Sequence, residues 1–397
     1  MRPGILKTAW ALALVVGFAA CRCGSGPAAS KDAAYYDGGL DGHTDAQPPG
    51  DAAPDAQGRD AWADASPCDA TFIELPPDGL SYISVVSNWG RWVAYDYDEN
   101  EGDPYSRADI YLYDLQTCTE HRITNEPTLM QWQPWVWDGR VVFGNDLDQY
   151  GNGVLVGYDI STSTFTNLFF ATSIACLGSM GNFVAYAARP DGQPSASHNW
   201  YLLQIDSGQS TLLQTTEDGA SSGGDMSETH FTWPSLVMNE HEGIHVVELA
   251  TGQQQIIQDS IMSTYPTTWG DWVVWENWDT GLPDIWGVRL GAGERVHVTD
   301  NGAYNGYPRL REHLLCFRTT LWAGGMGWDI AIMDMNTWVV RRVTETTHPG
   351  YSCAHAHAGW LVYRKQVRQN YIGWDKIYAV NLVAAGILDD QGRVIPE

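Results

Sequence analysis

Trp272-Val273-Val274-Trp275 is a short apolar segment bounded by large aromatic residues, and the chain repeats its pattern. Similar segments stand at Trp92-Val93-Ala94-Tyr95 and at Trp360-Leu361-Val362-Tyr363. With weaker copies included, the last residue of the segment recurs about every 45 residues, as Tyr95, Phe143, Tyr186, Met238, Trp275, Phe317 and Tyr363. A period of this length is typical of propellers and solenoids.

A second segment repeats with the same count. It is Asp109-Ile-Tyr-Leu-Tyr-Asp-Leu115 in one unit and Asp329-Ile-Ala-Ile-Met-Asp-Met335 in another, and many units then end in a segment such as Arg122-Ile-Thr124. We expect four strands per unit: strand a before a Trp-Gly turn, b through the aromatic segment, c through Asp-Ile-Tyr and d through Ile-Thr. One such sheet cannot bury both of its faces, so radial stacking is expected. The sequence predicts an all-β propeller of seven four-stranded blades, with six or eight as alternatives.

This cadence of Trp-Gly turn, aromatic strand, Asp-Ile-Tyr and Ile-Thr resembles the TolB-type propeller repeats, over roughly residues 80–395. The turn appears here as Trp89-Gly90 and Trp269-Gly270. The resemblance implies a propeller that contacts proteins through its loops. Residues 71–75 are one candidate for the strand that closes the ring, and residues 393–395 are the other.

The first residues are those of an export signal. Arg2 and Lys7 precede an apolar run of twelve residues, Ala9–Ala20, which is too short to span a bilayer as a helix. The run ends at Phe18-Ala19-Ala20-Cys21, which resembles a bacterial lipobox. The resemblance implies a signal peptide over residues 1–20 and a lipid on Cys21. We expect an outer-membrane lipoprotein of a bacterial cell envelope, on either face, that contacts the membrane through this lipid alone.

The next part of the chain has little to bury. Residues 21–67 are rich in Asp, Ala, Gly and Pro, and such a segment cannot offset its ordering entropy. We expect a disordered linker there and the propeller over residues 68–397. The formal net charge of −26 argues against nucleic acid as a partner, because phosphates would be repelled.

The cysteines suit an oxidising compartment and do not show zinc-site spacing. A disulfide between Cys68 and Cys118 would close the N-terminal segment onto the ring. Cys176 and Cys353 fall at the same position of units three and seven, so we expect them to lie across the ring and stay unpaired. The alternative is that all five cysteines of the folded part are free thiols.

Two groups of residues are candidate metal ligands. Asp96, Asp98, Asn100 and Asp103 alternate in a loop between strands b and c, which suits Ca²⁺, the one cofactor that the sequence suggests. His355 and His357 lie two apart on a predicted strand a, hence on one side of it. The alternatives are solvated turns for the first group, and for the second a solvated His355 with His357 in place of a packing Trp.

His355 and His357 also belong to the innermost strands, which line the channel of a propeller. In register, His355 corresponds to Ser87, Trp135, Gly178, His230, Thr267 and Arg309, and His357 corresponds to Trp89, Trp137 and Trp269. The segment His241-Glu-Gly-Ile-His245 matches a zincin motif, but that motif needs a helix. Here it falls at the hairpin between strands b and c, where two histidines four apart are too distant to share one zinc.

Four tryptophans near the loops between strands b and c, or near the starts of c strands, are candidate contact residues: Trp278, Trp322, Trp328 and Trp374. Exposed aromatic rings suit sugar stacking and protein contacts, while packing between blades is the alternative. The sequence shows no nucleophile elbow, phosphate loop or dinucleotide fingerprint. We therefore expect a non-catalytic module that recognises an envelope protein or glycan. A propeller lyase or hydrolase that uses channel histidines and acids, and a purely structural lipoprotein, are the alternatives.

Overall fold

The computed structural model describes residues 71–75, 83, 85–97, 108–125, 130–146, 152–189, 198–216, 223–234, 243–257, 263–279, 281–322, 327–344, 351–369 and 372–396. All of them belong to the compact unit Ala56–Glu397. The predicted signal peptide, Cys21 and the linker lie outside these ranges. No helix within them has the length and apolar character that crossing a bilayer requires.

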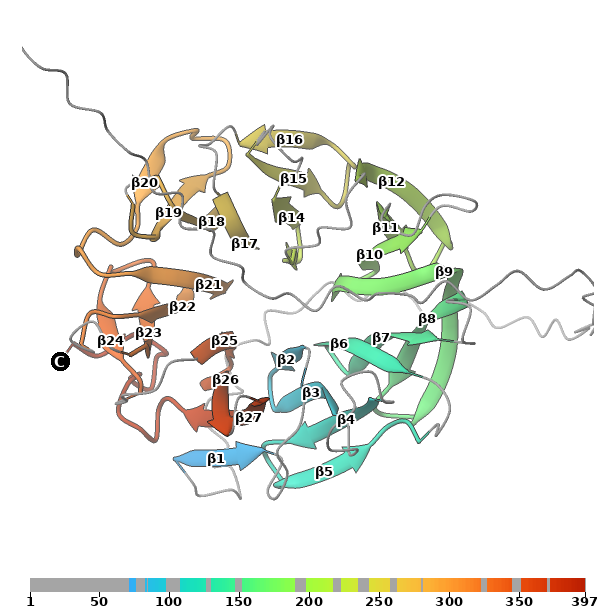
Figure 1. The fold of residues 1–397 in the computed structure, drawn as a ribbon, viewed down its shortest axis with the longest axis horizontal. Helices are drawn as coiled ribbons and strands as arrows, with labels where there is room; N and C mark the ends of the chain where they lie inside the picture. The colour runs from blue at the N-terminus through green and yellow to red at the C-terminus, as the bar shows by residue number, and fades with distance from the viewer. Residues whose placement is uncertain are drawn as a thin grey trace, which may run out of the picture. The chain divides into compact units, whose positions relative to one another are not determined.

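The described strands form five antiparallel sheets of four strands and one of seven, arranged around a ring (Figure 1). Blade one comprises β2 (Val86–Trp89), β3 (Trp92–Tyr97), β4 (Asp109–Asp114) and β5 (Thr119–Arg122). Blade two comprises β6 (Gln131–Trp137), β7 (Arg140–Asp146), β8 (Asn152–Asp159) and the first part of β9 (Thr164–Met180). Blade three comprises the rest of β9, β10 (Phe183–Arg189), β11 (His198–Gln204) and β12 (Gln209–Thr216). Blade four comprises β13 (Asp225–Met226), β14 (His230–Pro234), β15 (Ile244–Glu248) and β16 (Gln254–Ile257).

The other three blades follow in the same order. Blade five comprises β17 (Ser263–Trp269), β18 (Trp272–Asn277), β19 (Asp284–Arg289) and β20 (Arg295–His297). Blade six comprises β21 (Asn305–Arg311), β22 (Leu314–Thr319), β23 (Asp329–Asp334) and β24 (Val340–Arg342). Blade seven comprises β25 (Tyr351–His357), β26 (Trp360–Gln369), β27 (Ile372–Asn381) and β1 (Phe72–Leu75). The propeller is confirmed, and the number of blades in the whole chain stays a prediction.

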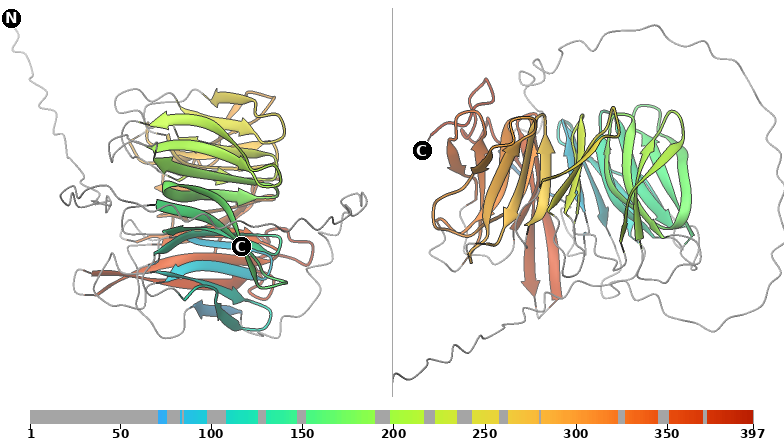
Figure 2. Two further views of the ribbon diagram at one scale, coloured as in Figure 1. Left: turned by 90° about the vertical axis from the view of Figure 1, so that its right-hand side faces the viewer. Right: turned by 90° about the horizontal axis from the view of Figure 1, so that it is seen from above.

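Two features depart from a ring of separate, equal blades. β9 runs unbroken from the outer edge of blade two to the inner edge of blade three, so these two blades share one seven-stranded sheet. The long hairpin of β26 and β27 extends beyond the other blades at one end of the ring (Figure 2).

The ring is closed by the N-terminal candidate. β1 pairs with β27 from Phe72↔Val380 to Leu75↔Ile377, so it is the outermost strand of the last blade. The competing segment instead forms an isolated bridge between Leu388 and Val394. The sheet of blade seven therefore joins the beginning of the described chain to its end.

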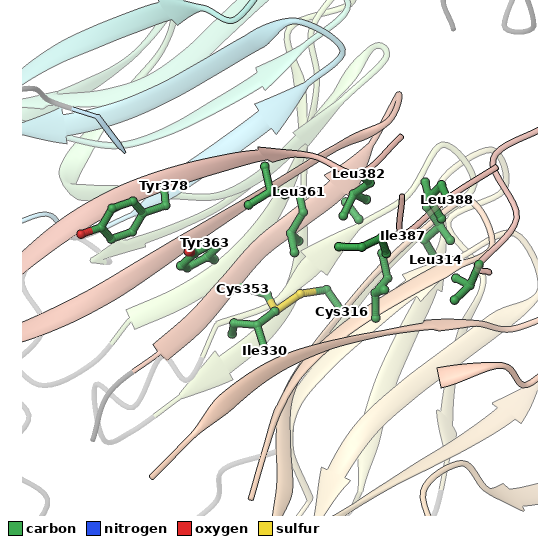
Figure 3. Close-up of a cluster of buried hydrophobic side chains, with 14 of the residues drawn as sticks. Leu314, Cys316, Ile330, Cys353, Leu361, Tyr363, Tyr378, Leu382, Ile387 and Leu388 are labelled. Atoms are coloured by element: carbon green, nitrogen blue, oxygen red, sulfur yellow. A yellow bond between two sulfur atoms is a disulfide. The ribbon is translucent and has the colours of Figure 1, made fainter. Parts of the chain in front are cut away.

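The core lies between the blades. Each cluster of buried apolar residues combines side chains of two neighbouring blades, and Figure 3 shows the one between blades six and seven. The aromatic residue that ends each b segment, for example Tyr95 or Trp275, is fully buried there. This burial of both sheet faces explains the alternation of large apolar residues that repeats along the sequence.

The Asp-Ile-Tyr and Ile-Thr segments repeat because they bond to each other. The Thr124 hydroxyl donates to Asp109 Oδ1 (2.9 Å), and its oxygen accepts the Ile110 N–H (2.9 Å). Thr299 makes the same two bonds in blade five, to Asp284 and to the Ile285 N–H (3.0 Å). The start of strand c is thereby joined to the end of strand d within each of these blades.

The predicted repeat is wrong in blade four. His230 was assigned to strand a, but it lies in strand b, where it pairs with Glu248. Asp225 takes the place in strand a, opposite Thr232. The aromatic residue that ends strand b is Trp233, and Met238, which was predicted there, lies outside the described residues. Strand c of this blade begins at Ile244, so His245 lies on a strand and not on a zincin helix.

The cysteines agree with the prediction only in part. Cys176 is buried and unpaired, as expected. Cys353 is not free: it forms a disulfide with Cys316, with 6.2 Å between the Cα atoms. Strand b of blade six packs against strand a of blade seven, and this packing brings the two side chains together. Cys118 is disulfide-bonded, and its partner lies outside the described residues, so the pairing with Cys68 stays a prediction.

Candidate functional site

Aromatic rings gather at the channel end beside the Trp-Gly turns. Trp89 stacks on His357 (3.8 Å between ring centroids) and contacts Trp137 with tilted rings (3.6 Å). It also lies 6.1 Å from Trp269 of blade five. Its turn also donates the Gly90 N–H to His357 Nδ1 (2.7 Å). His357 thus occupies the position of a packing Trp, as its register predicted.

One layer further in, acids and bases from opposite blades meet. Asp225 of blade four lies 3.5 Å from His355 Nε2 of blade seven and 3.5 Å from Arg311 Nη2 of blade six. The Thr267 hydroxyl donates to the same carboxylate, and Arg311 donates to the Met226 carbonyl (2.5 Å). Asp225, Arg311 and His355 are at most 3% exposed. These side chains form a buried ionic cluster across the channel.

The charges of this cluster set the ionisation of its members. Burial alone would raise the pKa of Asp225, but the Arg311 guanidinium and His355 hold that pKa well below its ordinary value. Burial and the nearby Arg311 lower the pKa of His355 to about 4. The same two causes lower the pKa of His357 to about 3. At neutral pH the cluster therefore holds an ionised carboxylate, a guanidinium and the neutral imidazole of His355, and the imidazole of His357 beside it is neutral as well.

These pKa values predict how stability depends on pH. An unfolded histidine takes up its proton near pH 6.5, whereas folded His355 and His357 stay neutral down to about pH 4 and pH 3. In this window the unfolded state binds more protons, so the free energy of unfolding falls as the pH falls, by about 1.4 kcal/mol per pH unit and histidine. We expect this loss between pH 6.5 and 4.5 in urea unfolding.

The matched variant is His355→Gln with His357→Gln, which should flatten the dependence although it also lowers overall stability. The exposed His121→Gln serves as the control. Equal slopes for the wild type and the double variant would contradict neutral, buried histidines.

The residues predicted as metal ligands have other partners in the structure or lie outside the described residues. Both carboxylate oxygens of Asp96 accept backbone N–H groups, from Val85 (3.1 Å) and from Gln133 (3.2 Å). Asp98, Asn100 and Asp103 lie outside the described residues, so the Ca²⁺ loop stays a prediction. Within the part of the chain that the structure describes, no three His, Cys, Asp or Glu side chains gather as a metal site requires. Beside His355 and His357, the cation of Arg311 disfavours a metal ion.

The contact between Asp96 and Gln133 is repeated elsewhere in the ring. Glu276, at the matching position of blade five, accepts the Tyr307 N–H of blade six (2.8 Å). Gln133 and Tyr307 both precede a proline and have positive φ angles of 55° and 53°. This conformation is costly for residues other than glycine, and it aims each N–H at the acid of the preceding blade. The acids after the aromatic segment therefore join neighbouring blades.

A second cluster lies at the opposite end of blades five and six from the Trp-Gly turns. Arg318 stacks over Tyr307 (3.7 Å from its guanidinium carbon to the ring centroid) and over Trp328 (4.4 Å). It also donates to the Tyr304 hydroxyl (2.8 Å). The Tyr304 ring meets Trp278 (5.6 Å) and Trp328 (4.1 Å) edge to face. We call Trp278, Tyr304, Tyr307, Arg318 and Trp328 the aromatic-arginine cluster.

This cluster lies at the surface and not in the interior. All five members are partly exposed, and they lie where strands β18 and β22 end and where β21 and β23 begin. Two apolar side chains at the same strand ends, Leu282 and Leu321, are 52% and 41% exposed. Below the rings the buried Glu276 has a raised pKa because of its burial, an effect that the Tyr307 N–H and Arg318 oppose.

The structure brings together two of the four predicted tryptophans, Trp278 and Trp328. Trp322 is half-buried against the core between blades five and six, with Arg342 over its ring (5.9 Å). The backbone of Trp374 lies in β27, and its side chain is outside the description. Sequence reasoning missed Asp225 and Arg311 of the ionic cluster, as well as Tyr304 and Arg318, which draw the two tryptophans together.

Comparison with known proteins agrees with this architecture. No protein-family model matches the chain, and no curated protein is significantly similar to it. The fold resembles a prolyl endopeptidase structure with a TM-score of 0.57 at 9% identity, over 86% of this chain and 51% of that one. It also resembles the β-propeller domain of the Trilobed protease from Pyrococcus furiosus, with a TM-score of 0.54 at 12% identity, over 74% of this chain and 93% of that one.

TolB from Acinetobacter baumannii is similar over 74% of this chain and 78% of its own, with a TM-score of 0.44 at 14% identity. The chain spans about half of the endopeptidase and nearly all of the propeller domain. At these identities the similarities to the endopeptidase and to the protease propeller establish the β-propeller fold alone, because a propeller supports many unrelated activities.

Proposed function

We propose that this chain is a non-catalytic recognition module of the bacterial cell envelope, held there by a lipid on Cys21. The observation that carries the proposal is the aromatic-arginine cluster. Trp, Tyr and Arg dominate the binding energy of protein interfaces, and here they converge, partly exposed, at one end of blades five and six. Flat rings around a cation suit an envelope protein or glycan.

The ionic cluster supports recognition over catalysis. Its histidine and acid are the side chains that a channel enzyme would use, but both are buried, and Trp89, Trp137 and Trp269 lie at the channel end beside them. A general base must lie within hydrogen-bond reach of the proton that it abstracts from the substrate. Here the carboxylate of Asp225 faces Arg311 and Thr267 instead.

The proposal predicts that binding depends on one end of the ring. We expect Trp278→Ala with Trp328→Ala to reduce capture of envelope components on the immobilised chain at least tenfold, because two anchor rings are lost. The matched control is Trp338→Ala. This ring is 42% exposed, but it lies in the turn between β23 and β24, at the other end of the blade.

Captured proteins and sugars would be quantified for each variant by mass spectrometry and monosaccharide analysis. Equal losses with Trp278→Ala/Trp328→Ala and with Trp338→Ala would contradict the proposed surface. Turnover of an envelope polysaccharide or peptide that disappears in His355→Ala would replace recognition with catalysis.

A further inference from the structure

A groove of about 590 Å³ runs between the outer strands of blades six and seven. Its walls come from β24 on one side and from the sheet β1–β27–β26–β25 on the other. The groove shares no residue with the ionic cluster or the aromatic-arginine cluster. Its volume is in the range of sites for small molecules.

The wall on blade seven is a row of aromatic rings. Phe72 contacts Tyr378 (5.0 Å between centroids), Tyr378 contacts Tyr363 (5.4 Å), and Tyr363 contacts Tyr351 (5.7 Å). Each ring comes from the next strand of the sheet, and Phe72 at the outer end is 49% exposed. Figure 3 shows the hydroxyls of Tyr363 and Tyr378 pointing away from the aliphatic part of the cluster. Tyr351, Tyr363 and Tyr378 are only 4%, 4% and 8% exposed, so Phe72 offers most of the ring surface of the row.

The groove has more positive than negative charge that is free of an ion pair within the described residues. Glu74 pairs with Lys376, and Arg342 pairs with Asp329 (3.0 Å). Lys365 and Arg341 form no ion pair with any residue that the structure describes: Lys365 lies 5.8 Å from the Tyr351 ring, and Arg341 donates to the Ile395 carbonyl (3.0 Å). Two partly buried cations thus face one groove in a chain whose net charge is −26.

These features specify the chemistry of a ligand. Cations without a counterion favour an anion, and the electron-rich face of an aromatic ring favours the weakly positive C–H groups of a sugar. Hydroxyls from Thr71 and the tyrosines suit a ligand with many hydroxyl groups. An acidic peptide would use the same cations, but it carries fewer hydroxyl groups to pair with these hydroxyls.

We propose that the groove binds an acidic saccharide, with a sugar ring against Phe72 and Tyr378 and its carboxylate on Lys365 and Arg341. This site is independent of the surface proposed above for recognition. It gives the chain a second, smaller binding site on the perimeter of the ring.

Calorimetry on the intact chain with trigalacturonate tests the proposal, with maltotriose as the neutral sugar and triaspartate as the anion without sugar rings. Trigalacturonate should bind, and the two controls should bind at least tenfold more weakly. Lys365→Gln with Arg341→Gln should weaken trigalacturonate binding at least tenfold, and so should Phe72→Leu, which keeps apolar bulk without a ring face. Arg140→Gln, at an exposed arginine of blade two, should leave it unchanged.

Near-ultraviolet circular dichroism would show that each variant is folded. Absence of heat with 10 mM trigalacturonate, equal binding of maltotriose or triaspartate, or binding that is unaffected by the charge variants would each overturn the site.

Discussion

Asp225→Asn is expected to lower the free energy of unfolding by about 3–5 kcal/mol, the usual effect of removing one partner from a buried ion pair. The substitution leaves the side chain nearly isosteric but leaves Arg311, which is 3% exposed, without its carboxylate. A folded domain is stable by only about 5–15 kcal/mol, so this loss is a large part of the total.

Urea unfolding of the intact chain at pH 7.5 measures the effect, with the exposed Asp206→Asn as the matched control. The physical cause can be isolated with Arg311→Met. Because that variant removes the orphaned cation, Asp225→Asn combined with Arg311→Met should be more stable than Asp225→Asn alone. A double variant no more stable than the single one would show that the charge pair is not the cause.

Loss of the Cys316–Cys353 disulfide is expected to cost about 2–4 kcal/mol. The crosslink closes a loop with a sequence separation of 37, and in the chain-entropy model such a loop restricts the unfolded chain by roughly 4 kcal/mol. Cys316→Ala with Cys353→Ala removes the link. Cys176→Ala is the control, because it deletes a buried thiol that has no bond to break.

Urea midpoints of the oxidised wild type, the reduced wild type and both variants would be compared. Peptide mapping without reductant should recover residues 316 and 353 in one crosslinked fragment. A double variant that loses no more stability than Cys176→Ala, or a free thiol at Cys353, would contradict this disulfide.

The sequence predicted the fold because each blade repeats the same buried positions. The aromatic segment and the Asp-Ile-Tyr segment recur because they fill the same spaces between blades, so their spacing carries the architecture. The closing strand was one of two candidates, and pairing with β27 selected it, since that partner comes from the other end of the chain. The sequence around residues 71–75 alone contains nothing that predicts such a contact.

The wrong assignment of strand a in blade four could have been recognised from the spacing of the repeat. Placing His230 in strand a makes the intervals to Gly178 and Thr267 52 and 37 residues, whereas Asp225 makes them 47 and 42. The even spacing favours Asp225, but the apolar strand of this blade lacks the usual Trp-Gly turn, which obscured the register. Without that register, the meeting of Asp225 with His355 could not be foreseen.

The other residues of the ionic cluster and the aromatic-arginine cluster could not be predicted, because their contacts are with residues distant in the sequence. Arg318 lies in an ordinary strand b, and only its pairing with strand a of the same blade, at Gly306, shows that it lies beside the Tyr307 ring. The Cys316–Cys353 disulfide was missed for a similar reason. Comparing cysteines within one register finds residues of distant blades, whereas a bond forms between different strands of adjacent blades.

β9 has a mechanical consequence for the ring. Because one unbroken strand of 17 residues serves blades two and three, no loop between them can act as a hinge. The junction of blades six and seven is held by a covalent bond. The junctions between blades two and three and between blades six and seven are therefore stiff. Relative motion of neighbouring blades must occur at the other junctions. The aromatic-arginine cluster spans one of these other junctions, between blades five and six. A ligand that binds to both blades there would therefore also stiffen the ring.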